Sequence, residues 1–172
     1  MVSIQIAKAL GCYVTTSCST ANIELCKSVG AHEVLDYKSE DIIKQLQSKG
    51  QIFDVILDNI GTPSNLYRAS PSFLKTDGKF LQVGLGMSLS AMRQLFGNLL
   101  IPGFLGGGKG KYVVVMAKGN NACFQQLATW VQEGKLRPVL DSTFEFDNVP
   151  KAFERLKTGR ARGKVVVRVR AP

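Results

Sequence analysis

The chain has 172 residues, about the length of one domain, and its 45% hydrophobic and 20% charged residues exclude a disordered or collagen-like protein. Its 22 Lys and Arg against 13 Asp and Glu give a net charge of +9, which raises the question of nucleic-acid binding. No nucleic-acid-binding motif with interleaved aromatic residues accompanies these bases, so we expect no nucleic-acid partner.

The first half of the chain alternates between predicted helices and strands. Residues 2–10 place apolar side chains near a period of 3.6, which predicts a helix ended by Gly11. Residues 53–58 form an almost unbroken apolar run that is typical of a buried strand. Between and after these segments we expect a strand at 13–17, a helix from 19 or 20 to 29, a strand at 33–35, a helix at 39–48 and a helix at 64–73.

The second half continues the alternation. We expect a turn at 76–78, a strand at 79–83, a helix at 88–100, a glycine-rich loop to 110, a strand at 112–117, a helix at 121–133, an extended segment at 136–146, a helix at 149–157 and a strand at 164–169. Strands that alternate with helices favour βαβ units. The sequence therefore predicts one α/β domain over 1–172, with a doubly wound, mostly parallel sheet and helices on both of its faces.

The cysteines and the single histidine show no metal-ligand spacing. Cys12, Cys18, Cys26 and Cys123 form no CxxC pair, and His32 is the only histidine, so we expect reduced thiols and no metal site. No run of about 18 apolar residues and no signal peptide is present in the sequence. These features predict a cytoplasmic protein that does not associate with membranes.

Five segments carry a family resemblance. They are IQIAKALG at 4–11, VGAHEVLDY at 29–37, FDVILDNIG at 53–61, GKLRPV at 134–139 and GRARGKVV at 159–166. In this order they make the chain similar to the cofactor-binding half of the medium-chain dehydrogenase/reductase superfamily, in its zinc-independent quinone or enoyl reductase branch. The resemblance covers nearly the whole chain and implies a Rossmann-like fold.

The resemblance also implies a fold that is incomplete at its N-terminus. In the family, a first strand and a glycine-rich, phosphate-binding turn precede the helix that begins here at Val2, so we expect weakened dinucleotide affinity. The strands beside the missing one would pair directly, or another segment or a second chain would fill the gap. The resemblance further implies a homodimer, formed through the edge strand at 112–117.

The resemblance implies NADPH as the cofactor. It places Ser19, Asn22 and Tyr37 around the adenosine 2′-phosphate, although lysine is commoner than asparagine at the second position. No acidic residue ends the strand at 13–17, where one would bind the ribose 2′-hydroxyl of NADH. The alternative is that Ser19 only caps a helix and that Tyr37 is a half-buried ring.

Further residues are implied to contact the cofactor. Asn59 and Gly84 follow two strands at the carboxyl edge of the sheet, where the family lines the nicotinamide ribose, although glycines there also serve tight turns. Arg160 and Arg162 match a segment that closes over the cofactor, with a solvated charged loop as the alternative. The run at 106–111 is not a P-loop, because no Ser or Thr follows its lysine and a strand comes next.

Two functions of different classes follow. The first is an NADPH-dependent reductase that acts on a small molecule, a quinone or an activated double bond, and is impaired when it stands alone because the family's catalytic groups lie largely in the missing half. The second is a cofactor-independent isomerase, cyclase or lyase on the same scaffold, with His32, Tyr37 and Asp58 as candidate acids and bases. A binding or dimerisation module without catalysis is a third interpretation.

Overall fold

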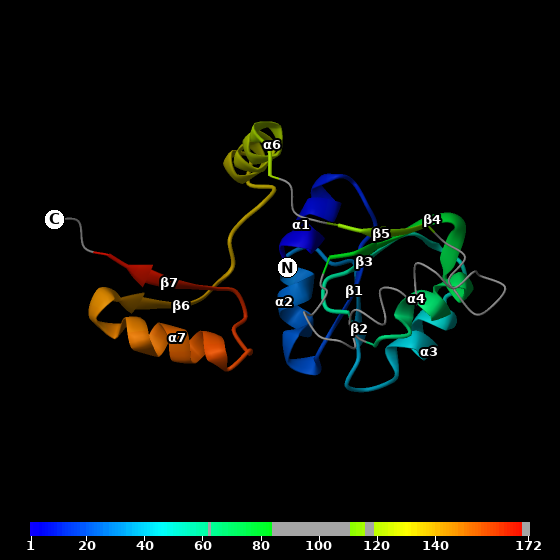
Figure 1. The fold of residues 1–172 in the computed structure, drawn as a ribbon, viewed down its shortest axis with the longest axis horizontal. Helices are drawn as coiled ribbons and strands as arrows, with labels where there is room; N and C mark the ends of the chain where they lie inside the picture. The colour runs from blue at the N-terminus through cyan, green and yellow to red at the C-terminus, as the bar shows by residue number, and fades with distance from the viewer. Residues whose placement is uncertain (62, 84–110, 116–118, 170–172) are drawn as a thin grey trace. The chain divides into compact units, whose positions relative to one another are not determined.

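The computed structural model describes residues 1–61, 63–83, 111–115 and 119–169 (Figure 1). The chain divides into two compact units. The first unit comprises Met1–Ser39 and Gly119–Pro172, and the second comprises Glu40–Lys118. The single domain expected over 1–172 stays a prediction.

The first unit opens with the parallel strand pair that the sequence predicts. Helix α1 (Val2–Ala9) leads to β1 (Thr15–Cys18), and a 3-10 turn, η1 (Thr20–Asn22), leads to α2 (Ile23–Ser28) and β2 (Glu33–Asp36). Glycines with positive φ, Gly11 and Gly30, follow the two helices, and Gly11 is the helix stop that the sequence predicts. Buried side chains of these helices, strands and turns pack into one hydrophobic core, made of Ile4, Val14, Cys18, Cys26, Val29 and Ala31.

The rest of the first unit is a βαβ unit preceded by a helix. Helix α6 (Asn121–Gln132) ends before Gly134, and β6 (Leu140–Glu145), the 3-10 turn η4 (Phe146–Asn148), α7 (Val149–Lys157) and β7 (Lys164–Arg168) follow. Figure 1 shows α7 along the parallel pair β6 and β7, and it packs against both strands. The buried amide of Gln5 joins this segment to α1, since its Oε1 accepts from the Arg137 amide at 2.8 Å and its Nε2 donates to the Arg137 carbonyl at 3.1 Å.

The second unit is a parallel three-stranded sheet with short helices. Its elements are α3 (Ile42–Gln47), β3 (Phe53–Asp58), α4 (Leu66–Ala69), the 3-10 turn η2 (Ser70–Ser72), β4 (Leu74–Gln82) and β5 (Lys111–Val114). The strand order is β3-β4-β5 and both pairings are parallel. Tyr67, Leu74 and Phe80 form the core of this unit, and the Phe80 ring stacks on Tyr112 with centroids 5.8 Å apart.

Every strand pairing in the described parts of the chain is parallel, which confirms the α/β class and the parallel pairing. The described strands form three separate sheets, β1-β2, β3-β4-β5 and β6-β7. The turn expected at 76–78 is wrong. These residues lie inside β4, where Phe53 pairs with Leu74 but Val55 pairs with Lys79, so β4 bulges between two short stretches of pairing. The helix expected at 88–100 and the loop at 102–110 lie outside the described residues.

Candidate functional site

The carboxyl ends of β1 and β2 bring together the three residues expected around the 2′-phosphate. The register pairs Cys18 with Asp36, and the Tyr37 amide donates to the Cys18 carbonyl at 3.2 Å. Ser19 and Asn22 therefore lie in the turn that follows β1, and Tyr37 begins the turn that follows β2. Tyr37 is 50% exposed, which leaves its ring accessible to a ligand.

The Ser19 hydroxyl contacts Asn22 and does not cap the following turn. Ser19 stands at the N-cap position of η1 but its side chain makes no capping hydrogen bond. Its Oγ instead accepts from the side-chain amide of Asn22 at 3.2 Å. Because the oxygen is used as an acceptor, the hydroxyl proton is available to donate elsewhere.

A buried oxygen of Asn22 has no hydrogen-bond partner among the described residues. This atom is Oδ1 of the same amide that donates to Ser19. A buried amide oxygen without a donor costs about 1–3 kcal/mol. Because this oxygen is enclosed by protein atoms, a bound molecule would reach it only if the turn rearranged.

Asp36 fixes this turn, and the sequence reasoning did not single it out. Its Oδ2 accepts from Oγ1 of Thr20 at 2.5 Å and its Oδ1 accepts from the Lys38 amide at 2.8 Å. These bonds, the Thr20 bond first, hold the pKa of the Asp36 carboxyl below its ordinary value. The only sequence signal was an aspartate directly before Tyr37, in a position from which a carboxylate can bond the turns after both strands.

Asp58 organises the turn after β3 in the second unit. The residue is 6% exposed, and its Oδ1 accepts from the Ile60 amide at 2.9 Å and the Gly61 amide at 2.7 Å. Gly61 has a φ of +80°, which a residue with a side chain rarely adopts. The exposed Asn59 lies at the tip of this turn, at the carboxyl edge where the sequence places it. Gly84 lies outside the described residues.

His32 joins the loop after α2 to the start of β1. Its Nδ1 accepts from the Val14 amide at 3.0 Å, and its ring stacks on Tyr13 with centroids 4.7 Å apart. An acceptor Nδ1 carries no proton, so a neutral ring holds its proton on Nε2. This arrangement gives His32 a structural role, and its use as a general base stays a hypothesis, as do the acid and base roles of Tyr37 and Asp58.

Arg160 and Arg162 lie in the loop between α7 and β7, and both are exposed. The loop backbone is tied down by Asp141 of β6, whose Oδ1 accepts from the Arg162 amide at 2.7 Å. The Arg155 guanidinium and the Arg162 amide hold the pKa of the Asp141 carboxyl well below its usual range. The two basic side chains are thus presented from an ordered backbone.

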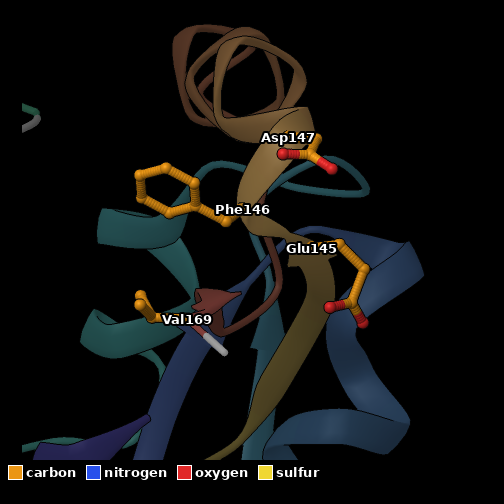
Figure 2. A pocket seen from close by; sticks show the side chains of 4 residues that line it. All are labelled: Glu145, Phe146, Asp147 and Val169. Carbon is orange, nitrogen blue, oxygen red and sulfur yellow. The ribbon is translucent and has the colours of Figure 1, made fainter. Parts of the chain in front are cut away.

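A hollow of about 330 Å³ lies at the ends of β6 and β7. Figure 2 shows Phe146 and Val169 on one side of it and Glu145 on the other, with Asp147 in the turn η4 that leads into α7. No residue predicted for the site lines this hollow.

No helix in the described ranges is both long and apolar enough to span a bilayer.

Comparison with known proteins identifies the family. The zinc-binding dehydrogenase family matches residues 29–167. The chain is 46% identical over 169 residues to a trans-enoyl reductase of Aspergillus terreus, which covers 96% of this chain and 47% of that protein. It is 34% identical over 180 residues to a mitochondrial NAD(P)H oxidoreductase of Homo sapiens, which covers 97% of this chain and 44% of that protein.

A solved structure agrees with these relatives. The quinone oxidoreductase from Coxiella burnetii superposes with a TM-score of 0.75 at 25% identity, over 98% of this chain and 49% of that one. The chain therefore belongs to the zinc-binding dehydrogenase family, and the resemblance to the cofactor-binding half of the medium-chain dehydrogenases and reductases is confirmed. It spans about half the length of the relatives it matches.

The family's name implies zinc, but the donor set described here does not fit that ion. Cys12 and Cys123 are exposed, whereas Cys18 and Cys26 are buried in the first unit's core. Across the described ranges, no three His, Cys, Asp or Glu side chains gather around one point. A structural zinc site needs four such ligands and a catalytic one needs three, so we assign these residues no role in zinc binding.

Proposed function

We propose that this chain is the cofactor-binding half of an NADPH-dependent reductase that acts on a quinone or an activated carbon–carbon double bond. The relatives named above are a trans-enoyl reductase, an NAD(P)H oxidoreductase and a quinone oxidoreductase. None of them points to isomerisation or elimination, so we do not propose the cofactor-independent alternative. When bound, the cofactor would supply the hydride.

The observation that carries the proposal is the pairing of Ser19 with Asn22 beside the open ring of Tyr37. Ser19 Oγ accepts from the Asn22 side-chain amide, which leaves the Ser19 hydroxyl proton free to bond a phosphate oxygen. The Tyr37 ring would cover the adenosine.

The other proposed contacts are electrostatic or line the ribose. Arg160 and Arg162 would balance the negative charge of the cofactor, because guanidinium groups bond phosphate oxygens in pairs. Asn59 and Gly84 would line the nicotinamide ribose at the carboxyl edge of the sheet. Asn22 is neutral where lysine is commoner, so we expect a smaller preference for NADPH over NADH than a lysine would give.

The test is a titration of the chain with NADPH and with NADH, followed by cofactor fluorescence. We expect saturable binding with NADPH preferred, and we expect Ser19→Ala to weaken NADPH binding by about tenfold, the worth of a charge-assisted hydrogen bond. Binding of NADH should not change in this variant. Ser28→Ala is the matched control, because its hydroxyl bonds only the Leu25 carbonyl of its own helix in the described structure.

Two results would contradict the proposal. One is the absence of saturable NADPH binding by the wild-type chain. The other is a Ser19→Ala variant that weakens both cofactors equally, because the lost contact would then not involve the 2′-phosphate. We also propose a small-molecule substrate and a homodimer, and sedimentation equilibrium would test the dimer directly.

A further inference from the structure

The loop that carries Arg160 and Arg162 is anchored at both of its ends. At its start, Thr158 Oγ1 donates to the Arg155 carbonyl at 2.7 Å and accepts from the Arg160 amide at 3.2 Å. At its end, the Lys164 amide donates to the Val139 carbonyl at 2.7 Å. The loop at 159–163 is therefore held by hydrogen bonds at both of its ends.

The middle of the loop is held by a partly buried ion pair. Asp141 accepts from Nε of Arg155 at 2.7 Å and from its Nη2 at 2.6 Å, a two-point bond between β6 and α7. The Asp141 side chain is 6% exposed and that of Arg155 is 35% exposed. The same carboxylate accepts from the Arg162 amide, and the same guanidinium donates to the Arg160 carbonyl at 3.3 Å.

These contacts bond the backbone of both basic residues and involve neither of their guanidinium groups. The charges of Asp141 and Arg155 balance each other, so the pair adds no repulsion toward an anion near the loop. The positive charge that remains at the loop comes from Arg160 and Arg162, on a backbone that is already ordered. An ordered loop loses less entropy when a ligand binds than a mobile one does.

We propose that Asp141 and Arg155 are positioning residues that hold the loop at 159–163 so that Arg160 and Arg162 bind the phosphate groups of the cofactor. The inference rests on the proposed function, because it concerns the same ligand. The inference goes beyond the proposed function because it assigns a role to Asp141 and Arg155, which are not expected to touch the cofactor.

The test is a mutant cycle with NADPH binding as its readout. Asp141→Asn keeps the shape of the side chain and removes its charge, and Arg155→Lys keeps the charge and removes the two-point geometry. We expect each to weaken NADPH binding by about tenfold. In a background of Arg160→Gln with Arg162→Gln, Asp141→Asn should weaken binding no further, because no charged side chains remain to be positioned.

The matched control is Glu145→Gln. Glu145 accepts from Arg168 Nη1 at 3.0 Å, so the variant also breaks an ion pair between β6 and β7, but among the described residues no bond joins that pair to the loop. We expect it to leave NADPH affinity unchanged. The unfolding midpoint of each variant is measured as well, because a purely structural role would lower the midpoint and leave the affinity of the folded protein as it was.

Hydrogen exchange of the cofactor-free chain tests the anchoring of the loop without the cofactor, and an Arg162 amide that exchanges equally fast in the wild type and in Asp141→Asn would overturn the positioning role. The Arg162 amide should be protected in the wild type and exchange rapidly in Asp141→Asn. If the wild type binds no NADPH, the proposed function fails and the positioning role falls with it, whatever the exchange shows. If the wild type binds NADPH but Asp141→Asn binds it equally well, or weakens binding additively with the loop arginines, only the positioning role is overturned.

Discussion

Oγ1 of Thr20 lies 2.5 Å from Oδ2 of Asp36, and this hydrogen bond ties the turn after β1 to the last residue of β2. The two residues stand 16 positions apart in the sequence. Thr20 lies within the turn, between Ser19 and Asn22, so the bond to Asp36 helps to fix the geometry of the candidate 2′-phosphate site. It also stabilises the ionised form of Asp36.

Thr20→Val should raise the pKa of Asp36 toward its ordinary value. The variant removes the donor that contributes most to the lowered pKa and keeps the size of the side chain. An NMR titration of the Asp36 carboxyl carbon measures the change. Thr15→Val is the control, because Thr15 donates to Glu33 at 3.2 Å between the same two strands and should leave the Asp36 titration unchanged. An unshifted Asp36 in Thr20→Val would contradict the assigned cause.

Asp141→Asn should destabilise the chain at neutral pH and much less in acid. Arg155 and the Arg162 amide lower the folded-state pKa of Asp141, whereas the pKa of the carboxyl in the unfolded chain is about 3.9. Its stabilising contribution is therefore full above about pH 4 and is lost as the pH falls toward the folded-state pKa. Urea unfolding of both proteins at several pH values measures this, and a difference that stays constant into acid would contradict it.

The four cysteines should divide into two reactivity classes. Cys12 and Cys123 are exposed, whereas Cys18 and Cys26 are buried. Burial, with Cys26 beside it, raises the pKa of the Cys18 thiol to about 12, so little of the reactive thiolate is present near neutrality. An aromatic disulfide reagent that releases a coloured thiolate should label two thiols rapidly in the folded chain and all four after unfolding. Cys12→Ser and Cys123→Ser should each remove one rapid site, and rapid labelling of Cys18 would contradict the burial.

Gly163→Ala should cost more stability than Gly134→Ala, although both glycines have positive φ. A Cβ at Gly163 would stand 2.4 Å from the Val139 carbonyl oxygen, whereas nothing lies within 4 Å of a Cβ at Gly134. Strain alone should cost Gly134→Ala about 1 kcal/mol, and the added backbone clash should raise the cost of Gly163→Ala above about 2 kcal/mol. Denaturant unfolding measures both, and equal losses would show that the loop end can shift.

The sequence by itself determined the order and type of most elements, because these depend on local chemistry. Apolar side chains at a 3.6 period predict α1, and a residue with no Cβ ends α1, α2 and α6, since Gly11, Gly30 and Gly134 follow them with positive φ. The family resemblance then selected the residues that β1 and β2 bring together, namely Ser19, Asn22 and Tyr37.

The tertiary structure alone decided which distant side chains meet. Thr20 reaches Asp36 because β1 and β2 pair in one register, and Arg155 reaches Asp141 because α7 packs on β6. Strand pairing and packing also produce the bulge in β4 and the bond from Val14 to His32. They likewise produce the bond from the Arg162 amide to Asp141, which orders the loop. Periodicity and turn signals describe neighbours along the chain, whereas strand register and helix packing bring together groups 14 to 21 residues apart.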